Sequence, residues 1–376
     1  MAESRRLVAR WISWSPVPIW GTVPVERLRR SLARAGIWDA GPWTGQVPPE
    51  GAAVLLLRGD HVYDDALMSA LVDTAELVVI RGDGRAVAAH VPRQRAEELA
   101  ASLSDGSAPP PDLPCRRGRE VVPAAVLRRR LRSGPLVMPV SAELREAVEN
   151  RLFAIASLAG TDAVARLLWP LPARALARLA IGLGLVPNQV TALSLILAVL
   201  AALLFHGGAL GAGLLAAWVM SLVDAVDGKL ARLTLSFSQV GAGLGHALAL
   251  AHPPLWWWAW WAGGGGGTLP MAVLVGGTLL QSTLERMFVW RQGFPWHEWT
   301  RFDGRFRLVA ANRNILLAMI SAGWLAGAPA MGFRVASAWL LLSLAVQALR
   351  LAQAWRTPQE SWLAARGWKP PEPPPI

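Results

Sequence analysis

The first third of the chain alternates between short apolar runs and amphipathic segments. Residues 25–35 carry leucines at helical spacing and stop at Gly36, which predicts a helix. Residues 52–57 and 77–80 are continuous apolar runs bounded by turn residues, which predicts two buried strands. A second helix is expected from Asp65 to Leu71. The pattern therefore predicts an α/β domain over residues 1–105.

The second half consists mainly of apolar stretches near the ~20 residues that a bilayer requires. The pattern predicts six transmembrane helices, at residues 189–206, 208–226, 238–262, 269–288, 313–331 and 335–354. Before them, residues 142–158 and 162–183 are expected to be helical. Their arginines among leucines indicate helices at the inner membrane surface, with a solvated basic face as the alternative.

These patterns divide the chain into five parts. The predicted fold is a multi-domain one, an N-terminal α/β domain followed by an all-α membrane domain of six transmembrane helices. The parts are the α/β domain at 1–105, a linker and basic segment at 106–140, juxtamembrane helices at 141–187, the membrane domain at 188–356 and a proline-rich tail at 357–376.

Charge is distributed unevenly between the parts. The net charge is +11, yet only 17% of residues are charged, and 18 of the 26 acidic residues fall within residues 1–150. With the N-terminus inside, Arg334 is the one basic residue of the predicted outer loops, in accord with the positive-inside rule. Met1–Arg10 carries no apolar signal segment. We therefore expect an integral inner or cytoplasmic membrane protein with its N-terminal domain in the cytoplasm.

Composition excludes several other functions. The only cysteine, Cys115, excludes a disulfide framework and a cysteine-based metal cluster. The excess of basic residues is not accompanied by a known nucleic-acid-binding motif, so nucleic acid is not an expected partner. The tryptophans at 256–258, 260 and 261 precede a glycine run at 263–267 and are expected to anchor the outer end of the third span at the interface.

The chemistry-bearing residues lie at the end of the second predicted span. Between Arg178 and Glu285 the only charged residues are Asp224, Asp227, Lys229 and Arg232. A spacing of three places both carboxylates on one helical face, where they suit a hard divalent cation that also holds phosphates. Gly228 permits close approach, Ala231 leaves room, and Arg232 can neutralise a phosphate. A charged loop at the membrane interface is the alternative interpretation.

This segment resembles the CDP-alcohol phosphatidyltransferase family, whose signature is D-x2-D-G-x2-A-R-x8-G-x3-D-x3-D. The chain matches it at six positions, namely Asp224, Asp227, Gly228, Ala231, Arg232 and Gly241, and Val186-Pro-Asn-Gln-Val-Thr191 is typical of the stretch before that family's first span. The resemblance implies transfer of a phospho-alcohol from a CDP-alcohol to an acceptor hydroxyl, with release of CMP. Asp224 and Asp227 would bind Mg²⁺ or Mn²⁺, and Gly228, Ala231, Arg232 and Gly241 would bind substrate.

The match fails at the third and fourth aspartates of the signature. Gly245 and Ala249 occupy these positions, which in the family complete the two-metal site and supply the general base. Loss of a general base typically costs about 10²–10⁴-fold in rate. His246 and His252 are the candidates for replacing these groups, and helix packing is the alternative role for both. Arg313 is a candidate for binding an acceptor phosphate and equally a positive-inside anchor.

The N-terminal domain resembles sugar-phosphate nucleotidyltransferases at Gly21–Arg27, Arg34–Gly36 and Leu57–His61. In that family the aspartate matching Asp60 holds metal and nucleotide. The glycine-rich phosphate loop is missing, because residues 7–16 contain no glycine or lysine. We therefore expect a degenerate domain. The pair of domains is similar to bifunctional inositol-1-phosphate cytidylyltransferase/di-inositol phosphate synthases.

Two functions remain open after this comparison. The first is an active membrane phosphotransferase of phospholipid or phosphodiester biosynthesis. The second is an inactive relative that binds a CDP-alcohol or lipid, or that supports a partner enzyme. Expected partners are a CDP-alcohol, an acceptor alcohol or lipid, and the membrane. The sequence leaves a homodimer open. A transporter has only the predicted spans in its favour.

Overall fold

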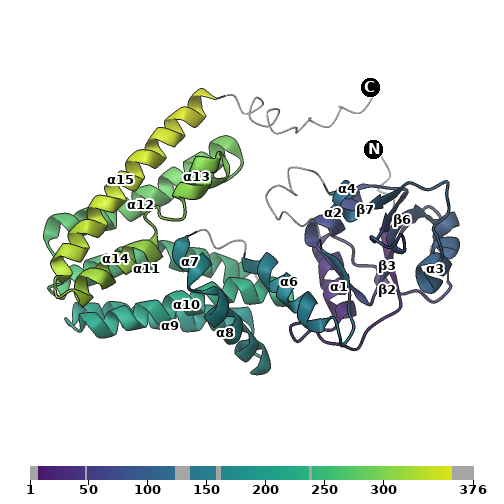
Figure 1. The fold of residues 1–376 in the computed structure, drawn as a ribbon, viewed down its shortest axis with the longest axis horizontal. Coiled ribbons are helices and arrows are strands. Elements are labelled where there is room, and N and C mark those ends of the chain that lie inside the picture. The colour runs from purple at the N-terminus through teal and green to yellow at the C-terminus, as the bar shows by residue number, and fades with distance from the viewer. Residues whose placement is uncertain (1–6, 47–48, 123–135, 158–161, 237–238, 358–376) are drawn as a thin grey trace. The chain divides into compact units, whose positions relative to one another are not determined.

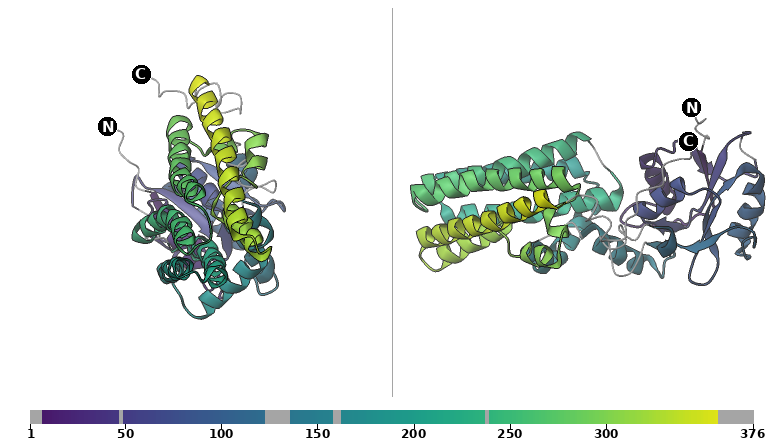
Figure 2. Two further views of the ribbon diagram at one scale, coloured as in Figure 1. Left: turned by 90° about the vertical axis from the view of Figure 1, so that its left-hand side faces the viewer. Right: turned by 90° about the horizontal axis from the view of Figure 1, so that it is seen from above.

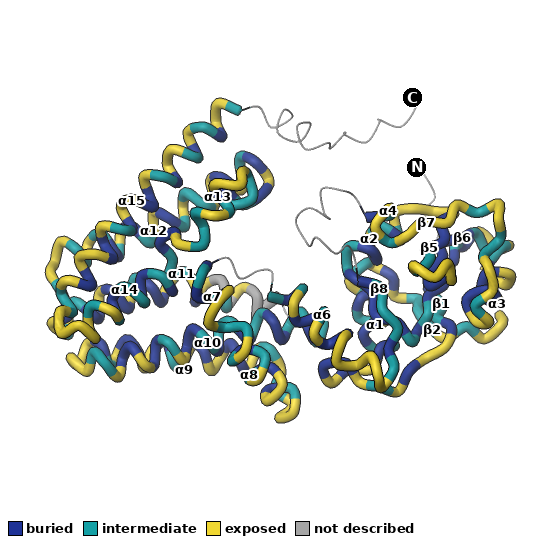
Figure 3. The backbone as a smooth tube through the Cα atoms, viewed as in Figure 1, coloured by how far each residue is buried: buried dark blue, intermediate teal, exposed yellow. Residues whose placement is uncertain are grey.

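A computed structural model of the chain describes residues 7–46, 49–122, 136–157, 162–236 and 239–357 (Figure 1). The chain divides into two compact units. The first comprises Met1–Ala156 and Leu233–Leu235, and the second comprises Ser157–Arg232 and Ser236–Ile376. Each unit has its own buried apolar clusters, visible as the dark segments of Figure 3.

The first unit is built on a six-stranded mixed sheet with the order β2-β1-β3-β6-β5-β7. β1 pairs in parallel with both β2 and β3, whereas β6 runs antiparallel to β3 and β5. The strands are β1 (Leu7–Ile12), β2 (Ala40–Pro42), β3 (Ala53–Arg58), β5 (Leu77–Ile80), β6 (Ala86–Pro92) and β7 (Cys115–Arg117). This sheet confirms the α/β character expected from the apolar runs.

Helices cover both faces of the sheet. The reason is that successive side chains of β3 point to opposite faces of the sheet. Leu55 and Leu57 join the apolar cluster with α1 (Pro24–Arg34) and α2 (Asp65–Asp73). Val54 and Leu56 join the cluster with α3 (Ala96–Asp105) on the other face. The 3₁₀ turn η1 (Arg93–Arg95) leads into α3. Pro24 opens α1, where its missing N–H would have no helical partner in any case.

The stretch expected as a linker, residues 106–140, contains regular structure. β7 pairs in parallel with β5 and is followed by α4 (Gly118–Val121), and β8 (Val137–Pro139) pairs antiparallel with β4 (His61–Tyr63). Proline and charged residues dominate this stretch, so its sequence does not predict strands. The strands have only three residues each, and their hydrogen-bond partners are distant in sequence. The basic segment Leu127–Arg132 lies outside the described residues.

The second unit is helical. It begins at Ser157, the last residue of α6 (Arg145–Ser157), and continues with α7 (Ala163–Leu167) and α8 (Pro170–Gly182). The long helices follow: α9 (Pro187–His206), α10 (Leu210–Thr234), α11 (Gln239–Ala262), α12 (Thr268–Gln292), α14 (Arg313–Leu325) and α15 (Pro329–Arg356). Between α12 and α14 lie η2 (Trp296–Glu298) and α13 (Arg301–Phe306). α9 packs along α11, and α15 packs along α12 and α14 (Figure 2).

Helices occupy all six predicted span positions, but six spans are not confirmed. Within the described residues, three helices are long and apolar enough to cross a membrane: α9, α10 and α15. α14 is apolar but has only 13 residues, against the ~20 that a bilayer requires. α12 includes Glu285, Arg286 and Arg291 in its second half. The three spans and the apolar helices support an integral membrane protein.

The tryptophan cluster differs from its expected role at an interface. Trp256, Trp257 and Trp260 are at most 1% exposed and belong to the apolar core shared by α9, α10, α11 and α15. The indole of Trp256 donates to the carbonyl of Ala198 at 2.8 Å. Of the other two tryptophans, Trp258 is 43% exposed, and Trp261 is partly buried and packs against the same core. Helix periodicity turns three of the rings inward, which a run of identical residues does not reveal.

The glycine run at 263–267 forms the loop between α11 and α12, and close contacts with neighbouring helices explain why glycine is needed there. Gly263 lies against the carbonyl of Phe205, so an added Cβ would overlap that oxygen, and Gly264 has φ +82°. Gly266 lies against the ring of Phe333. The loop between α11 and α12 therefore packs against the end of α9 and the first turns of α15. The proline-rich tail beyond residue 357 lies outside the described residues.

Candidate functional site

Helix α10 positions the two carboxylates of the signature. The helix is continuous from Leu210 to Thr234, so Asp224 and Asp227 share a face, and Ser221 lies one turn before Asp224 on that face. Both carboxylates are partly buried, and Ser221 is fully buried. The structure thus supports the predicted helical placement of these aspartates, and places them in the half of α10 away from the glycine loops.

Asp227 is bound by a residue at the start of the preceding span. The hydroxyl of Thr191 lies 2.8 Å from Asp227 Oδ2 and 3.1 Å from the carbonyl of Pro187. Pro187 is the first residue of α9, and Gln189 accepts a hydrogen bond from the Val186 amide at 3.0 Å. The stretch Val186–Thr191 therefore fixes the N-terminus of α9 and holds one carboxylate of the signature.

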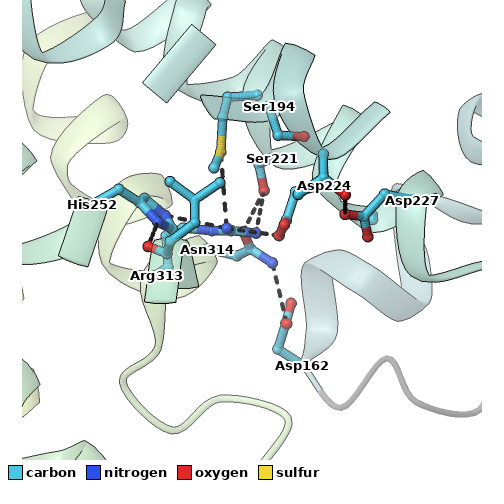
Figure 4. A network of polar contacts seen from close by, with 12 residues as sticks. Asp162, Ser194, Ser221, Asp224, Asp227, His252, Arg313 and Asn314 are labelled. Atoms are coloured by element: carbon cyan, nitrogen blue, oxygen red, sulfur yellow. Dashed lines mark hydrogen bonds and ion pairs between the residues drawn. The ribbon is translucent and has the colours of Figure 1, made fainter. Parts of the chain in front are cut away.

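Asp224 forms an ion pair with Arg313, the first residue of α14. Arg313 Nη1 lies 2.8 Å from Asp224 Oδ2, with side-chain exposures of 17% and 29% (Figure 4). Arg313 Nη2 donates to Ser221 Oγ at 3.2 Å, and Nη1 also lies 3.9 Å from the sulfur of Met220. The arginine expected to bind an acceptor phosphate or to anchor the span forms an ion pair with the first aspartate of the signature.

His252 joins this group from α11 and is 3% exposed. Its Nδ1 lies 2.6 Å from the carbonyl of Leu248, and its Nε2 lies 3.2 Å from Arg313 Nη1. A carbonyl oxygen only accepts, so Nδ1 carries the proton and Nε2 accepts from the guanidinium. Both ring nitrogens are therefore engaged. His252 does reach the site, as the helical spacing from Ala249 indicated, but as a hydrogen-bond partner of Arg313.

A further layer of polar side chains supports Arg313. Ser221 Oγ donates to Asn314 Oδ1 at 2.5 Å, and Asn314 Nδ2 donates to Asp162 Oδ2 at 3.2 Å (Figure 4). Asp162 also caps α7 by accepting from the Ala165 amide at 2.9 Å. Sequence reasoning did not assign Thr191, Ser221, Asn314 or Asp162 to the site. The available signals were their polarity beside apolar helices and, for Ser221, the one-turn spacing from Asp224.

Gly228, Ala231 and Arg232 of the signature lie on the last turns of α10 together with Lys229, and Gly241 lies in the first turn of α11. Lys229 is 6% exposed and its Nζ donates to the carbonyl of Ala225 at 2.9 Å. A Cβ added at Gly228 would lie 3.5 Å from the Arg232 guanidinium, so the absence of a side chain there leaves space beside that cation. Ala231 is partly exposed on the same turn. The side chain of His246 is not among those that the structure describes.

The residues around Asp224 do not fit a two-metal centre. Mg²⁺ prefers near-octahedral oxygen ligands, and a second ion needs further carboxylates. One oxygen of Asp224 is bound to Arg313, and Gly245 and Ala249 supply no ligand. Within the described residues, no group of three or more histidine, cysteine, aspartate or glutamate side chains could hold a metal ion. The family generally uses divalent metal ions, whereas the donor set here places a guanidinium against the first carboxylate.

In the first unit, Asp60 is paired within its own turn. Asp60 Oδ2 accepts from Arg58 Nη2 at 2.6 Å, and Oδ1 accepts from His61 Nδ1 at 2.6 Å. Burial alone would raise the pKa of Asp60, but the hydrogen bonds from His61 and Arg58 outweigh it and hold the pKa well below its usual range. Asp60 follows β3, and its described partners are Arg58 and His61, which lie within the same turn.

A cavity of about 660 Å³ lies beside the carboxyl ends of β1 and β2. Trp11, Trp14 and Trp43 line it together with small apolar residues of α3. Glu97 is the one charged side chain among its described lining residues. A triphosphate needs cations or backbone amides around it, and this lining offers one carboxylate instead. The cavity therefore does not restore the phosphate loop that the sequence lacks.

Comparison with known proteins gives a match for the helical part of the chain. A search of curated proteins finds no match. The sequence model of the CDP-alcohol phosphatidyltransferase family matches residues 184–358. This range begins just before α9 and ends just after α15, so it covers Thr191, Asp224, Asp227, His252 and Arg313. The match supports assignment of residues 184–358 to the CDP-alcohol phosphatidyltransferase family.

Proposed function

We propose that the membrane part of this chain binds a CDP-alcohol and does not carry out the transfer reaction of its family. The observation that carries the proposal is the loss of a general base. Ala249 stands where a carboxylate would accept the proton of the acceptor hydroxyl, and His252 has both ring nitrogens engaged. Without a base at this position, rate falls by about 10²–10⁴-fold.

Retained binding rests on the cations that α10 presents. Arg232 lies beside Gly228, and Lys229 lies close enough to Asp224, Asp227 and Arg232 to interact with them electrostatically. A diphosphate is recognised by such cations, and a planar guanidinium binds two phosphate oxygens at once. We place the CDP diphosphate near Gly228 and Arg232, with the alcohol moiety directed toward lipid.

A second candidate function is transfer by this same site. The observation in its favour is that the first half of the signature is intact on a single helix face, with Asp227 fixed by Thr191. In this case the protein would release CMP from a CDP-alcohol in the presence of an acceptor alcohol. The Mg²⁺ or Mn²⁺ that the family uses would have to displace Arg313 from Asp224.

For the first unit we propose a degenerate, non-catalytic nucleotidyltransferase-like domain. Its support is the Asp60 turn, closed by Arg58 and His61, and the lack of a described cation around the nearby cavity. Its cytoplasmic location is part of the same proposal, because the basic loops of the membrane part favour that side. A homodimer remains a proposal from the family resemblance alone.

The decisive experiment uses the full chain purified in detergent or nanodiscs. Binding of CDP and of CDP-diacylglycerol is measured by calorimetry, and CMP release is scored with a panel of acceptor alcohols and Mg²⁺ or Mn²⁺. We expect saturable CDP binding that Arg232→Gln weakens, and no CMP release. CMP release that Asp224→Asn abolishes would establish the second candidate. Absence of CDP binding under every condition would reject both.

A further inference from the structure

Arg313 has a donor group directed at each polar neighbour in the site. Nη1 contacts Asp224 at 2.8 Å and His252 Nε2 at 3.2 Å, Nη2 contacts Ser221 at 3.2 Å, and Nε contacts Asn314 Oδ1 at 3.3 Å (Figure 4). These partners come from α10, α11 and α14. Four acceptors hold the guanidinium in position. An arginine that served only as a positive-inside anchor would not need such a set of partners.

The neutral state of His252 is part of this arrangement. Because Leu248 requires the proton on Nδ1, protonation of Nε2 would place an N–H group against the Arg313 guanidinium. The ring therefore offers Arg313 a lone pair without adding a charge. His252 also packs edge-on against Trp256, with ring centroids 4.7 Å apart. It acts as a support for the arginine and keeps the guanidinium on the side of Asp224.

Charge balance in the site is reached without an added ion. Three carboxylates, Asp162, Asp224 and Asp227, lie near three cations, Lys229, Arg232 and Arg313. A site with four aspartates, as the family signature has, carries an excess of negative charge that divalent ions neutralise. Here the losses at 245 and 249 remove two negative charges, and Arg313 neutralises a third.

We infer that Arg313 is the built-in cation of this site and takes the place of a divalent metal ion at Asp224. The inference rests on the proposed function for its ligand, since it states that the diphosphate of a CDP-alcohol binds here without a divalent ion. Arg313 is a positioning residue in this scheme. It holds Asp224 and neutralises that carboxylate, while Arg232, beside Gly228, lies where we place the phosphates.

The test has one arm that does not involve the nucleotide. Mn²⁺ binding to the full chain is measured by electron paramagnetic resonance, for the wild-type protein and for the triple variant Arg313→Gln, Gly245→Asp, Ala249→Asp. A Cβ at Gly245 meets nothing within 4 Å, and Ala249 is exposed, so both carboxylates have space. We expect no saturable Mn²⁺ binding by the wild type and saturable Mn²⁺ binding by the variant.

The second arm measures CDP binding with and without EDTA. We expect EDTA to leave the wild-type affinity unchanged, Arg313→Gln to weaken it about tenfold or more, and Arg313→Lys to restore it in part. Arg334→Gln is the matched control, because Arg334 is exposed at the start of α15 and contacts only its own helix among described partners. Melting temperatures of all variants report folding.

Saturable Mn²⁺ binding by the wild-type protein, or CDP binding that EDTA abolishes, would overturn the inference. If CDP does not bind at all, the proposed function fails. The Mn²⁺ measurement then still tests whether Arg313 takes the place of a divalent ion at Asp224. If Arg313→Gln does not fold, the wild-type Mn²⁺ and EDTA measurements decide alone.

Discussion

At the scale of single residues, the site is defined by which oxygen each donor reaches. Asp224 and Asp227 are equivalent in the signature, yet one is bound by a guanidinium and the other by a hydroxyl. The first bond neutralises a charge, and the second leaves the charge of Asp227 to be balanced by Lys229 and Arg232. A difference of one neighbouring side chain thus gives two identical residues different roles.

Replacement of Thr191 by valine tests the bond to Asp227. The change keeps the shape of the side chain but removes the hydroxyl, so a partly buried carboxylate oxygen loses its partner. We expect a loss of about 1–3 kcal/mol in the free energy of unfolding, measured by denaturant titration in detergent.

The matched control is Thr283→Val. Thr283 is exposed on α12, and its hydroxyl bonds only to the carbonyl of Leu279 in its own helix among described contacts. We expect a change within about 0.5 kcal/mol. Equal effects of the two substitutions would contradict the assigned role of Thr191.

At the scale of helices, packing decides what a repeated residue type does. The tryptophans of α11 are the same residue type, but their environments differ. Three of them face α9, α10 and α15, while Trp258 faces outward. The loops of glycine between α11 and α12 allow this packing, because Gly263 and Gly266 contact neighbouring helices directly.

Truncation of Trp256 tests this division of the cluster. Trp256→Ala removes a buried ring and its hydrogen bond to Ala198, so we expect a loss of about 3–5 kcal/mol in the free energy of unfolding. Trp258→Ala, on the same helix but 43% exposed, is the matched control and should cost far less. Similar losses for both residues would indicate that the cluster acts as an interface anchor after all.

At the scale of the whole molecule, the chain combines an α/β unit with a helical membrane unit. The two have separate cores, and the boundary lies near Ala156, after β7 and β8 have joined the first unit. The resemblance to two-domain synthases is a prediction from the sequence that is not confirmed for the first unit, and the family match covers residues 184–358. The α/β unit consequently remains the part whose role depends most on experiment.

The orientation of the chain in the membrane is testable through its single cysteine. Cys115 is exposed in β7 of the first unit, so a membrane-impermeant maleimide can reach it from the side on which that unit lies. We expect labelling in inverted vesicles and none in intact spheroplasts, because the basic loops favour a cytoplasmic first unit. Labelling of intact cells would reverse the predicted topology, and Cys115→Ser controls for background.

The sequence by itself determined the division into an α/β part and a helical part, the positions of the long helices and the placement of two carboxylates on one face, because these follow from the periodicity of apolar residues and from a fixed spacing. It also marked the losses at Gly245 and Ala249. Only the tertiary structure decided that Arg313 pairs with Asp224, that His252 is engaged at both nitrogens and that three tryptophans are core residues. Each of these depends on contacts between residues about 60 to 90 positions apart, whose geometry is set by helix packing and leaves no local pattern.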